Sequence, residues 1–405
     1  MASNSYRPYL LAVSVSVPAA IIVFVAVRYC LSASPEPPTL AERRGSRAVS
    51  TLQFVAVFAR HGNRGPYGNF PSYPYPLNDT RTWPYGRLQI SRRGRTQMFN
   101  LGTKFRSLYN GFLSLNYKSE EFKAYSTLTD RTIMSAQLLL AGLYPSHGDQ
   151  LWNKKILWDP VPVFPTYLDN LQLMYRPDLC PAFHEDRKRS DKELDKVYMS
   201  EAAPILKGIE LYTGEKINYE DPLALRTSMY LLWDTLNCAE NEGLPLPAWT
   251  KKFYRQPMES VMLKTFVAIS IATDKMIRLF GGRLFQEMIT FMQDKTLGKL
   301  NPDRRMVVYC GHDYTVLGML GILGLIRGSA PFVVESGSAL IFELHQDPHS
   351  LLPYVQVMYI DGATPELEPK EITIPDFDPP YDFELVKNLT ERYYNISDWE
   401  QECKI

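Results

Sequence analysis

The sequence is poor in cysteine, has no net charge and contains one apolar run long enough to span a bilayer. It has five cysteines among 405 residues, too few for a disulfide scaffold but enough for one or two bridges. Lysine and arginine together number 44, and so do aspartate and glutamate. A chain without net charge lacks the overall positive potential that attracts nucleic acids, so we expect no nucleic-acid partner. Any bound anion must then be attracted by individual arginines in its site. Four histidines show no metal-ligand spacing and are assigned no role: His147, His184, His345 and His349.

The apolar run lies at the N-terminus. Residues 9–27 contain no charged residue and are flanked by Arg7 and Arg28, and a run of this length can span a bilayer. Small residues at 32–34 offer a cleavage site, but Arg28 argues against cleavage. We favour an uncleaved, membrane-anchoring signal over a removed signal peptide, with a buried core helix as the third interpretation. Both of the favoured interpretations direct the body of the protein to the secretory pathway, where its location is lumenal, lysosomal or extracellular.

Glycosylation signals and cysteines agree with this location. Asn78, Asn388 and Asn395 each begin an Asn-X-Ser/Thr sequon, so we expect a glycoprotein. An oxidising lumen permits disulfides. The cysteines after the N-terminal segment are Cys180, Cys238, Cys310 and Cys403.

Two polar motifs follow two apolar runs that are typical of buried strands. Arg60-His61-Gly62-Asn63-Arg64-Gly65-Pro66 comes directly after residues 52–59, and Gly311-His312-Asp313 after residues 306–310. Arginine and histidine at the end of a buried strand suit an anion site better than a core. The five fixed positions of the first motif should recur by chance on the order of once in ten thousand sequences. The second motif alone is weak, because a His-Asp pair is often only a polar turn.

Strand and helix patterns alternate on both sides of a long helical stretch. We therefore expect an α/β fold, with a parallel-rich central sheet flanked by helices and a smaller helical cap domain inserted. The expected segments are a signal or anchor with a linker (1–50), the first part of the core (51–165), the cap (166–255), the second part of the core (256–365) and a C-terminal tail (366–405).

The patterns also predict individual elements. The expected strands are 52–59, 122–127, 161–164, 306–310, 339–345 and 354–360. The expected helices are one capped by Ser91 and those at 131–143, 193–212, 221–242, 258–279, 283–295 and 314–325. Ligands of such folds bind at the carboxyl ends of the strands, so we expect His61 and His312 to meet there.

The residues of these motifs suit a phosphate monoester. Arginine pairs two phosphate oxygens at once and stays charged. We expect Arg60, Arg64 and Arg131, which begins a predicted helix, to bind the phosphoryl group. Gly62 and Gly65 would leave room for the anion. The structural alternative for Arg131 alone is an ordinary salt bridge.

The histidines and the aspartate would perform the reaction. His61 would attack phosphorus through its neutral nitrogen, forming a phosphohistidine that water hydrolyses, and nearby arginines would keep the ring neutral. Asp313 is the candidate proton donor for the leaving alkoxide. His312 would donate a hydrogen bond to the phosphoryl group as charge builds. This chemistry requires no metal and no cofactor.

At these residues the chain resembles the histidine acid phosphatases, in the branch of the prostatic and lysosomal acid phosphatases. The first motif matches the family's nucleophile motif, Gly311-His312-Asp313 matches its acid motif, and residues 83–94 and 126–136 are similar to two further blocks. The resemblance implies an α/β core with a helical cap, metal-free phosphomonoester hydrolysis and a homodimer. It also implies a disulfide between Cys180 and Cys403.

The chain departs from the family pattern at a few positions. Leu88 stands where the family usually has glycine, and Ser91 where it often has threonine. Cys238 occupies the position of a bridged cysteine whose usual partner is missing. Cys310, beside the predicted site, is interpreted as a structural free thiol.

Other functions remain open. A phytase-like or sugar-phosphate phosphatase of the same superfamily would keep these motifs, although a phytase should need more lysines for several phosphates. The loop after Pro66 is instead rich in aromatic residues, which favours a monophosphate on an apolar or aromatic group unless these residues only pack. A catalytically silent secreted binding protein is the non-enzyme alternative. The aromatic residues of the loop are Tyr67, Phe70, Tyr73, Tyr75 and Trp83.

Overall fold

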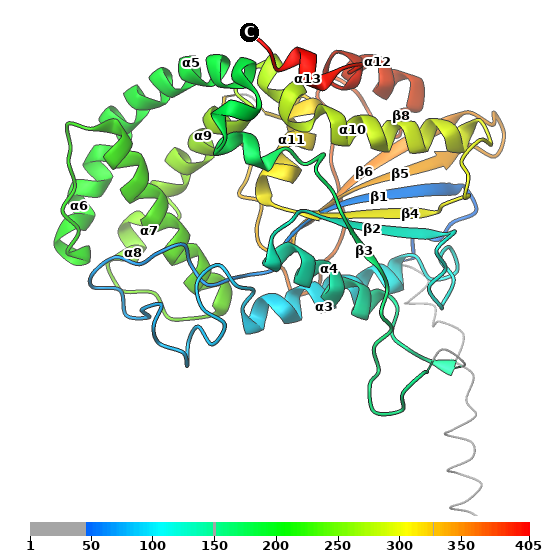
Figure 1. The fold of residues 1–405 in the computed structure, drawn as a ribbon, viewed down its shortest axis with the longest axis horizontal. Helices are drawn as coiled ribbons and strands as arrows, with labels where there is room; N and C mark the ends of the chain where they lie inside the picture. Colours follow the sequence, from blue (N-terminus) through cyan, green and yellow to red (C-terminus); the bar gives the residue numbers. More distant parts are fainter. Residues whose placement is uncertain (1–45, 149–150, 327) are drawn as a thin grey trace, which may run out of the picture. The chain divides into compact units, whose positions relative to one another are not determined.

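A mixed eight-stranded sheet runs through the part of the chain that the computed structural model describes, residues 46–148, 151–326 and 328–405 (Figure 1). Its order is β3-β2-β4-β1-β5-β6-β7, with β8 paired to β6. The first four strands of this order are parallel, and the others pair antiparallel. The strands are β1 (Leu52–Arg60), β2 (Phe122–Ser126), β3 (Val163–Pro165), β4 (Met306–Gly311), β5 (Ala339–Gln346), β6 (Pro353–Ile360), β7 (Lys370–Glu371) and β8 (Tyr381–Asp382).

Helices cover both faces of the sheet (Figure 1). Alternate residues of β1 divide between two cores: Val55 and Val57 join the cluster that contains α3 and α4, whereas Phe54 and Phe58 join the cluster that contains α10, α11 and α12. A strand covered on both faces is apolar throughout, which explains why its position is predictable. The flanking helices are α3 (Arg92–Leu108), α4 (Asp130–Leu143), α10 (Asp274–Thr296), α11 (Asp313–Ile322) and α12 (Phe383–Tyr394).

A helical segment between β3 and β4 stands beside the sheet (Figure 1). Its apolar residues belong to the same cluster as those of α10 and α11, so it packs on the core directly. The predicted α/β fold with a helical insertion is confirmed, whereas the predicted segment limits stay a prediction. The helices of this segment are α5 (Pro181–Val197), α6 (Ala203–Thr213), α7 (Pro222–Glu242), α8 (Thr250–Phe253) and α9 (Met258–Ser270), with a π-helical turn at Tyr198–Ala202.

Two predicted helix boundaries are wrong. The helix predicted at 193–212 begins at Pro181, as α5, and continues through the π-helical turn into α6. The sequence predicts a break between residues 279 and 283, but Gly281 and Gly282 lie inside α10, and the break falls at 271–273. Thr273 caps α10, accepting from Met276 N, which is a standard helix start. A Cβ atom on Gly282 would lie 2.2 Å from the carbonyl oxygen of Tyr393. The glycine therefore marks close packing of α12 against α10, and not a helix end.

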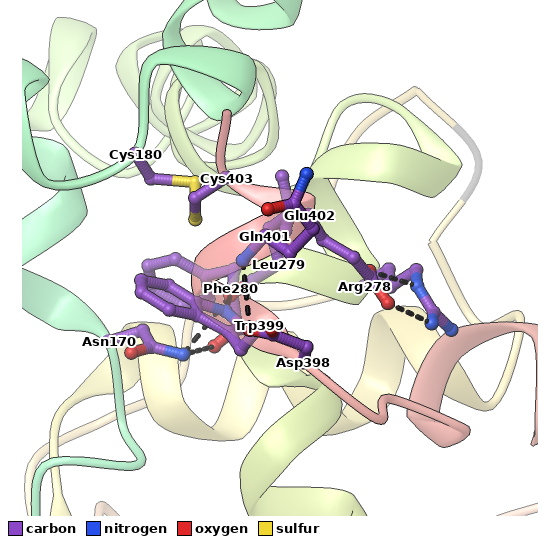
Figure 2. Close-up of a disulfide and its surroundings, with 10 residues drawn as sticks. All are labelled: Asn170, Cys180, Arg278, Leu279, Phe280, Asp398, Trp399, Gln401, Glu402 and Cys403. Carbon is purple, nitrogen blue, oxygen red and sulfur yellow. Dashed lines mark hydrogen bonds and ion pairs between the residues drawn. A yellow bond between two sulfur atoms is a disulfide. The ribbon is translucent and has the colours of Figure 1, made fainter. Parts of the chain in front are cut away.

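The C-terminal tail is tied to the body by the predicted disulfide (Figure 2). Cys180 and Cys403 are bonded, with their Cα atoms 4.5 Å apart and a sequence separation of 223 residues. Trp399 donates its indole N–H to Leu279 O at 2.9 Å, and Arg278 pairs with Glu402 at 2.6 Å. The other two cysteines of the described residues, Cys238 and Cys310, are free and buried.

The predicted signal or anchor segment at 9–27 and its cleavage stretch at 32–34 lie outside the described residues. Within the described residues, no helix combines the length and the apolar character needed to cross a bilayer.

Candidate active site

The two predicted motifs meet at the carboxyl edge of the sheet. β1 and β4 are parallel neighbours, with Arg60 in register with Gly311, so His61 and His312 follow at the same edge. His61 N donates to Gly311 O at 3.0 Å. The two imidazole rings are 5.5 Å apart and nearly perpendicular, at 79°. Residues 251 positions apart in the chain thus share one site.

Hydrogen bonding leaves one ring nitrogen of His61 with a lone pair. Nδ1 lies 2.8 Å from the carbonyl oxygen of Gly62. A carbonyl oxygen only accepts, so Nδ1 carries the hydrogen of the neutral ring and Nε2 does not. Burial, followed by the positive charges of Arg131 and Arg60, holds the pKa of His61 well below its usual range. The ring is therefore neutral at mildly acidic pH.

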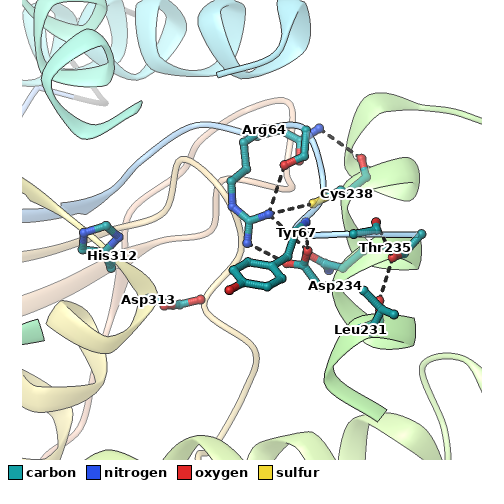
Figure 3. Close-up of polar contacts among 12 residues, drawn as sticks. Arg64, Tyr67, Leu231, Asp234, Thr235, Cys238, His312 and Asp313 are labelled. Carbon is teal, nitrogen blue, oxygen red and sulfur yellow. Dashed lines mark hydrogen bonds and ion pairs between the residues drawn. The ribbon is translucent and has the colours of Figure 1, made fainter. Parts of the chain in front are cut away.

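Arg64 is held in place by the helical segment (Figure 3). Its guanidinium donates to both carboxylate oxygens of Asp234 on α7, at 2.6 and 3.2 Å. Asp234 also accepts from Tyr67 N at 2.6 Å, and Cys238 Sγ lies 3.5 Å from the Arg64 guanidinium. A bidentate pair fixes the plane of an arginine, so α7 orients this side of the site.

Arg60 and Arg131 complete the cationic surroundings of the two histidines. Arg60 donates to Val334 O and pairs with Asp313 at 3.2 Å. Arg131 lies 3.5 Å from Nδ1 of His312. Burial, together with the charges of these arginines, also holds the pKa of His312 well below its usual range.

Each of the three arginines keeps one buried donor without a partner among the described residues. This donor is Nε in Arg60, in Arg64 and in Arg131. Arg95, Arg106, Arg226 and Arg304 share this feature, so it does not mark the site by itself. The charges of Arg60, Arg64 and Arg131 all act on the buried His61, and this convergence indicates an anion site. An anion with several oxygens can accept from all of them.

Asp313 and His312 begin helix α11 at the same edge. The Asp313 side chain is 23% exposed, and its Oδ1 accepts from Tyr314 N at 2.9 Å. Nε2 of His312 lies 3.0 Å from Thr127 Oγ1, while Nδ1 faces Arg131. Both ring nitrogens of His312 thus have protein partners, and its predicted hydrogen bond to a phosphoryl oxygen requires one of these contacts to give way.

The predicted role of Gly62 and Gly65 is corrected. A Cβ atom on Gly62 would lie 2.3 Å from Gly94 O, and one on Gly65 would lie 2.3 Å from Gly86 O. These glycines therefore let two backbone segments pack together rather than leave room for the anion. The neighbouring Leu88 has a φ of +60°, a conformation that favours glycine, which accounts for the glycine that the resemblance implies there.

Sequence reasoning missed the residues that support the site from other elements. Asp234 lies 170 positions from Arg64, and nothing in its local sequence marks it as a partner. Asp169 and Thr315, buried near the Gly311-His312-Asp313 motif, are equally unmarked. Within the described residues, no group of three or more His, Cys, Asp or Glu side chains could hold a metal ion.

Comparison with known proteins agrees with this geometry. The model of the histidine phosphatase superfamily (branch 2) matches residues 51–360. The chain belongs to this family. The predicted family membership is confirmed, and phosphatase function, as a phosphomonoesterase, is supported by the family and by its curated relatives.

The curated relatives include prostatic and lysosomal acid phosphatases. The prostatic acid phosphatase of Bos taurus is 30% identical over 374 residues, covering 90% of this chain and 91% of the relative. The lysosomal acid phosphatase of Homo sapiens is 30% identical over 376 residues, covering 91% and 82%.

Solved phytase structures share the fold of this phosphatase. The phytase of Citrobacter braakii superposes with a TM-score of 0.63 at 16% identity, covering 88% of this chain and 100% of that one. The Hafnia alvei phytase in complex with tartrate gives 0.62 at 17% identity, covering 88% and 98%.

Proposed function

We propose that this phosphatase is a metal-independent acid phosphatase that hydrolyses phosphate monoesters through a phosphohistidine at His61, with Asp313 as the general acid. The observation that carries the proposal is the convergence of Arg60, Arg64 and Arg131 on the buried, neutral imidazole of His61, with Asp313 paired to Arg60. The phosphoryl group would accept from Arg60, Arg64 and Arg131. Since Arg60 also pairs with Asp313, a bound phosphate would compete for that guanidinium and release the carboxyl group.

The reaction then proceeds in two displacements. Nε2 of His61 forms a bond to phosphorus while the ester P–O bond breaks, and the proton of the Asp313 carboxyl group passes to the leaving oxygen. Asp313, now a carboxylate, takes a proton from water, whose oxygen attacks phosphorus and breaks the P–N bond. Inorganic phosphate leaves, and His61 is again neutral.

The decisive test compares phosphate release from an aryl phosphate at pH 5 for the wild type, His61→Ala and His147→Ala. We expect the His61 variant to lose at least about a thousandfold in kcat and the His147 variant to match the wild type. Quenching into alkali, in which phosphohistidine is stable, should trap phosphate on His61. A folded wild type that binds phosphate without turnover would instead support the silent binding protein.

The mouth of the site favours an aromatic leaving group. Phe70, Tyr73 and Trp83 are buried, so most of the predicted aromatic loop serves packing. Tyr67 is 50% exposed, and the Arg87 guanidinium lies 4.4 Å from the centre of its ring. We infer that Tyr67 contacts an aryl leaving group. Tyr67→Ala should raise KM for an aryl phosphate more than for glycerol 2-phosphate, and equal effects on both would oppose this inference.

A phytase-like specificity has less support. Of the two arginines in the loop after the motif, Arg81 is paired with Asp79 at 3.0 Å, which leaves Arg87. With Arg60, Arg64 and Arg131 assigned to one phosphate, a single unpaired arginine in this described loop leaves little positive charge for further phosphates. A sugar-phosphate substrate remains an outcome of a phosphomonoester screen.

The acid phosphatase relatives and the disulfide support the predicted secretory-pathway location. We propose glycosylation at Asn78, Asn388 and Asn395, which are exposed, and membrane anchoring through residues 9–27. Mass spectrometry of glycans and N-terminal sequencing of the mature protein test both proposals.

We propose that the protein forms a homodimer. β3 ends the sheet, and the loop before it exposes Trp152, Leu157 and Trp158 at 57%, 69% and 40%. Exposed apolar residues beside an edge strand suit a second copy of the chain. Light scattering of the wild type and Trp158→Glu tests this, and a wild-type monomer would refute it.

A further inference from the structure

Asp169 is a buried carboxyl group near the site to which the proposed reaction gives no role. It follows β3 and is 5% exposed. One of its oxygens accepts from the hydroxyl group of Thr315, and the other accepts from Leu171 N at 3.3 Å. No cation forms an ion pair with Asp169 within the described part of the chain.

Thr315 connects this carboxyl group to the catalytic turn. His312 N donates to Thr315 Oγ1 at 2.9 Å, so the hydroxyl hydrogen of Thr315 is directed to Asp169. A Cβ atom on Gly311 would lie 2.4 Å from Thr315 Oγ1 and 2.9 Å from Asp169 Oδ2. The end of β4 and the first turn of α11, where Asp313 lies, are thus packed on this hydrogen-bonded pair.

Asp169 also shares its surroundings with other titratable groups. Burial raises the pKa of Asp169 to about 6, against the opposing effect of its hydrogen bonds from Thr315 and Leu171, and the charge of Asp313 raises it further. Cys310 on β4 faces the same carboxyl group, but burial raises the pKa of its thiol far above neutrality. Asp313 on α11 is therefore the charged group that acts on Asp169.

We propose that Asp169 is a positioning residue for the general acid: through Thr315 it orients the turn that carries Asp313. This inference rests on the proposed function. As a carboxylate, Asp169 accepts from both Thr315 and Leu171, whereas its protonated form has only one oxygen that solely accepts.

Asp169→Asn preserves an acceptor for Thr315 but replaces the acceptor for Leu171 N with an amide nitrogen, which cannot accept. The turn that carries Asp313 should therefore be held less firmly at pH values above about 6, at which Asp169 of the wild type is a carboxylate. At pH 6.5 we expect kcat/KM for an alkyl phosphate to fall about 3- to 10-fold, and for p-nitrophenyl phosphate, whose leaving group needs little protonation, by less than about twofold. At pH 4.5 Asp169 is itself protonated, and the variant should match the wild type.

Asp186→Asn is the matched control, because Asp186 is also a buried carboxyl group that accepts from a helix-capping threonine, Thr273, at 2.7 Å. It should lower the melting temperature without moving the pH profile. Thr315→Val should reduce kcat/KM for the alkyl phosphate, and Thr315→Ser should restore it, which keeps the inference testable if Asp169→Asn does not fold.

The outcomes separate the two claims. A wild type inactive on every monoester refutes the proposed function, and this inference with it. If the wild type is active and Asp169→Asn leaves its pH profile unchanged, the inference alone is overturned. If Asp169→Asn then also lowers stability as much as Asp186→Asn does, the role of Asp169 is structural.

Discussion

At the scale of single residues, burial and positive charge act together on His61. Both disfavour imidazolium, and Arg131 is the first of the charges that lower the pKa of this ring. In the proposed reaction the arginines therefore serve two purposes, because the groups proposed to bind the phosphoryl oxygens would also keep His61, the proposed nucleophile, unprotonated at acidic pH.

Replacing Arg131 separates these purposes. In Arg131→Gln the imidazolium of His61 is repelled less, so the pKa of His61 should rise and the acid limb of kcat/KM should move to higher pH. Inhibition by inorganic phosphate should weaken about 10- to 100-fold. Rate profiles from pH 3 to 8 measure both effects, with the exposed Arg92→Gln as control. An unmoved acid limb would mean that Arg131 contributes binding only.

A second residue-scale prediction concerns Leu88, whose φ is +60°. Removing the side chain from this left-handed conformation should stabilise the fold by about 1–2 kcal/mol. The greater conformational freedom of glycine in the unfolded chain should destabilise the fold by about 0.5–1 kcal/mol. Leu88→Gly should thus raise the free energy of unfolding by about 0.5–1 kcal/mol in urea denaturation. Leu297→Gly, at a φ of −87°, should lower it, and the same sign for both variants would contradict the argument.

The sequence predicts the residues proposed to react better than the residues that support them. His61 and His312 follow apolar runs that end at one edge of a parallel sheet, so their proximity is foreseeable. Asp234 and Asp169 reach the site from a helix and a loop whose placement depends on packing across the whole chain. No local pattern carries that information.

At the scale of elements, glycine has two meanings that a single sequence does not distinguish. A Gly-Gly pair at 281–282 is typical of a helix break, yet both residues lie within α10 because α11 and α12 approach it there. Only the neighbouring helices, placed by the sheet, decide between a break and a close contact.

The two glycines predict different responses to alanine. A Cβ atom on Gly282 meets Tyr393 O at 2.2 Å, whereas one on Gly281 meets the flexible end of Ile322 at 3.3 Å. Overpacking costs about 1–3 kcal/mol, and alanine gains about 1 kcal/mol of helix propensity. We expect Gly282→Ala to be about 2 kcal/mol less stable than Gly281→Ala in urea denaturation. Equal stabilities would show that α12 adjusts without cost.

At the scale of the whole molecule, alternating strand and helix patterns predict the α/β class and the helical insertion, since both follow from local periodicity. The antiparallel pairing of β5 and β6 with β1 is not predictable in this way. It depends on which sheet edge the chain returns to after α11, and period-2 patterns are alike in both orientations.

The Cys180–Cys403 disulfide affects the whole molecule, because it joins the C-terminal tail to the start of α5, 223 residues away in the sequence. In the chain-entropy model a loop of this length stabilises the fold by about 5 kcal/mol. The ion pair of Arg278 with Glu402 and the Trp399 hydrogen bond also hold the tail, so the fold should survive reduction with a lower midpoint. Urea denaturation with and without reductant should show this fall for the wild type but not for a Cys180→Ser, Cys403→Ser double variant. A double variant that lost the same stability on adding reductant would show that the reductant acts elsewhere.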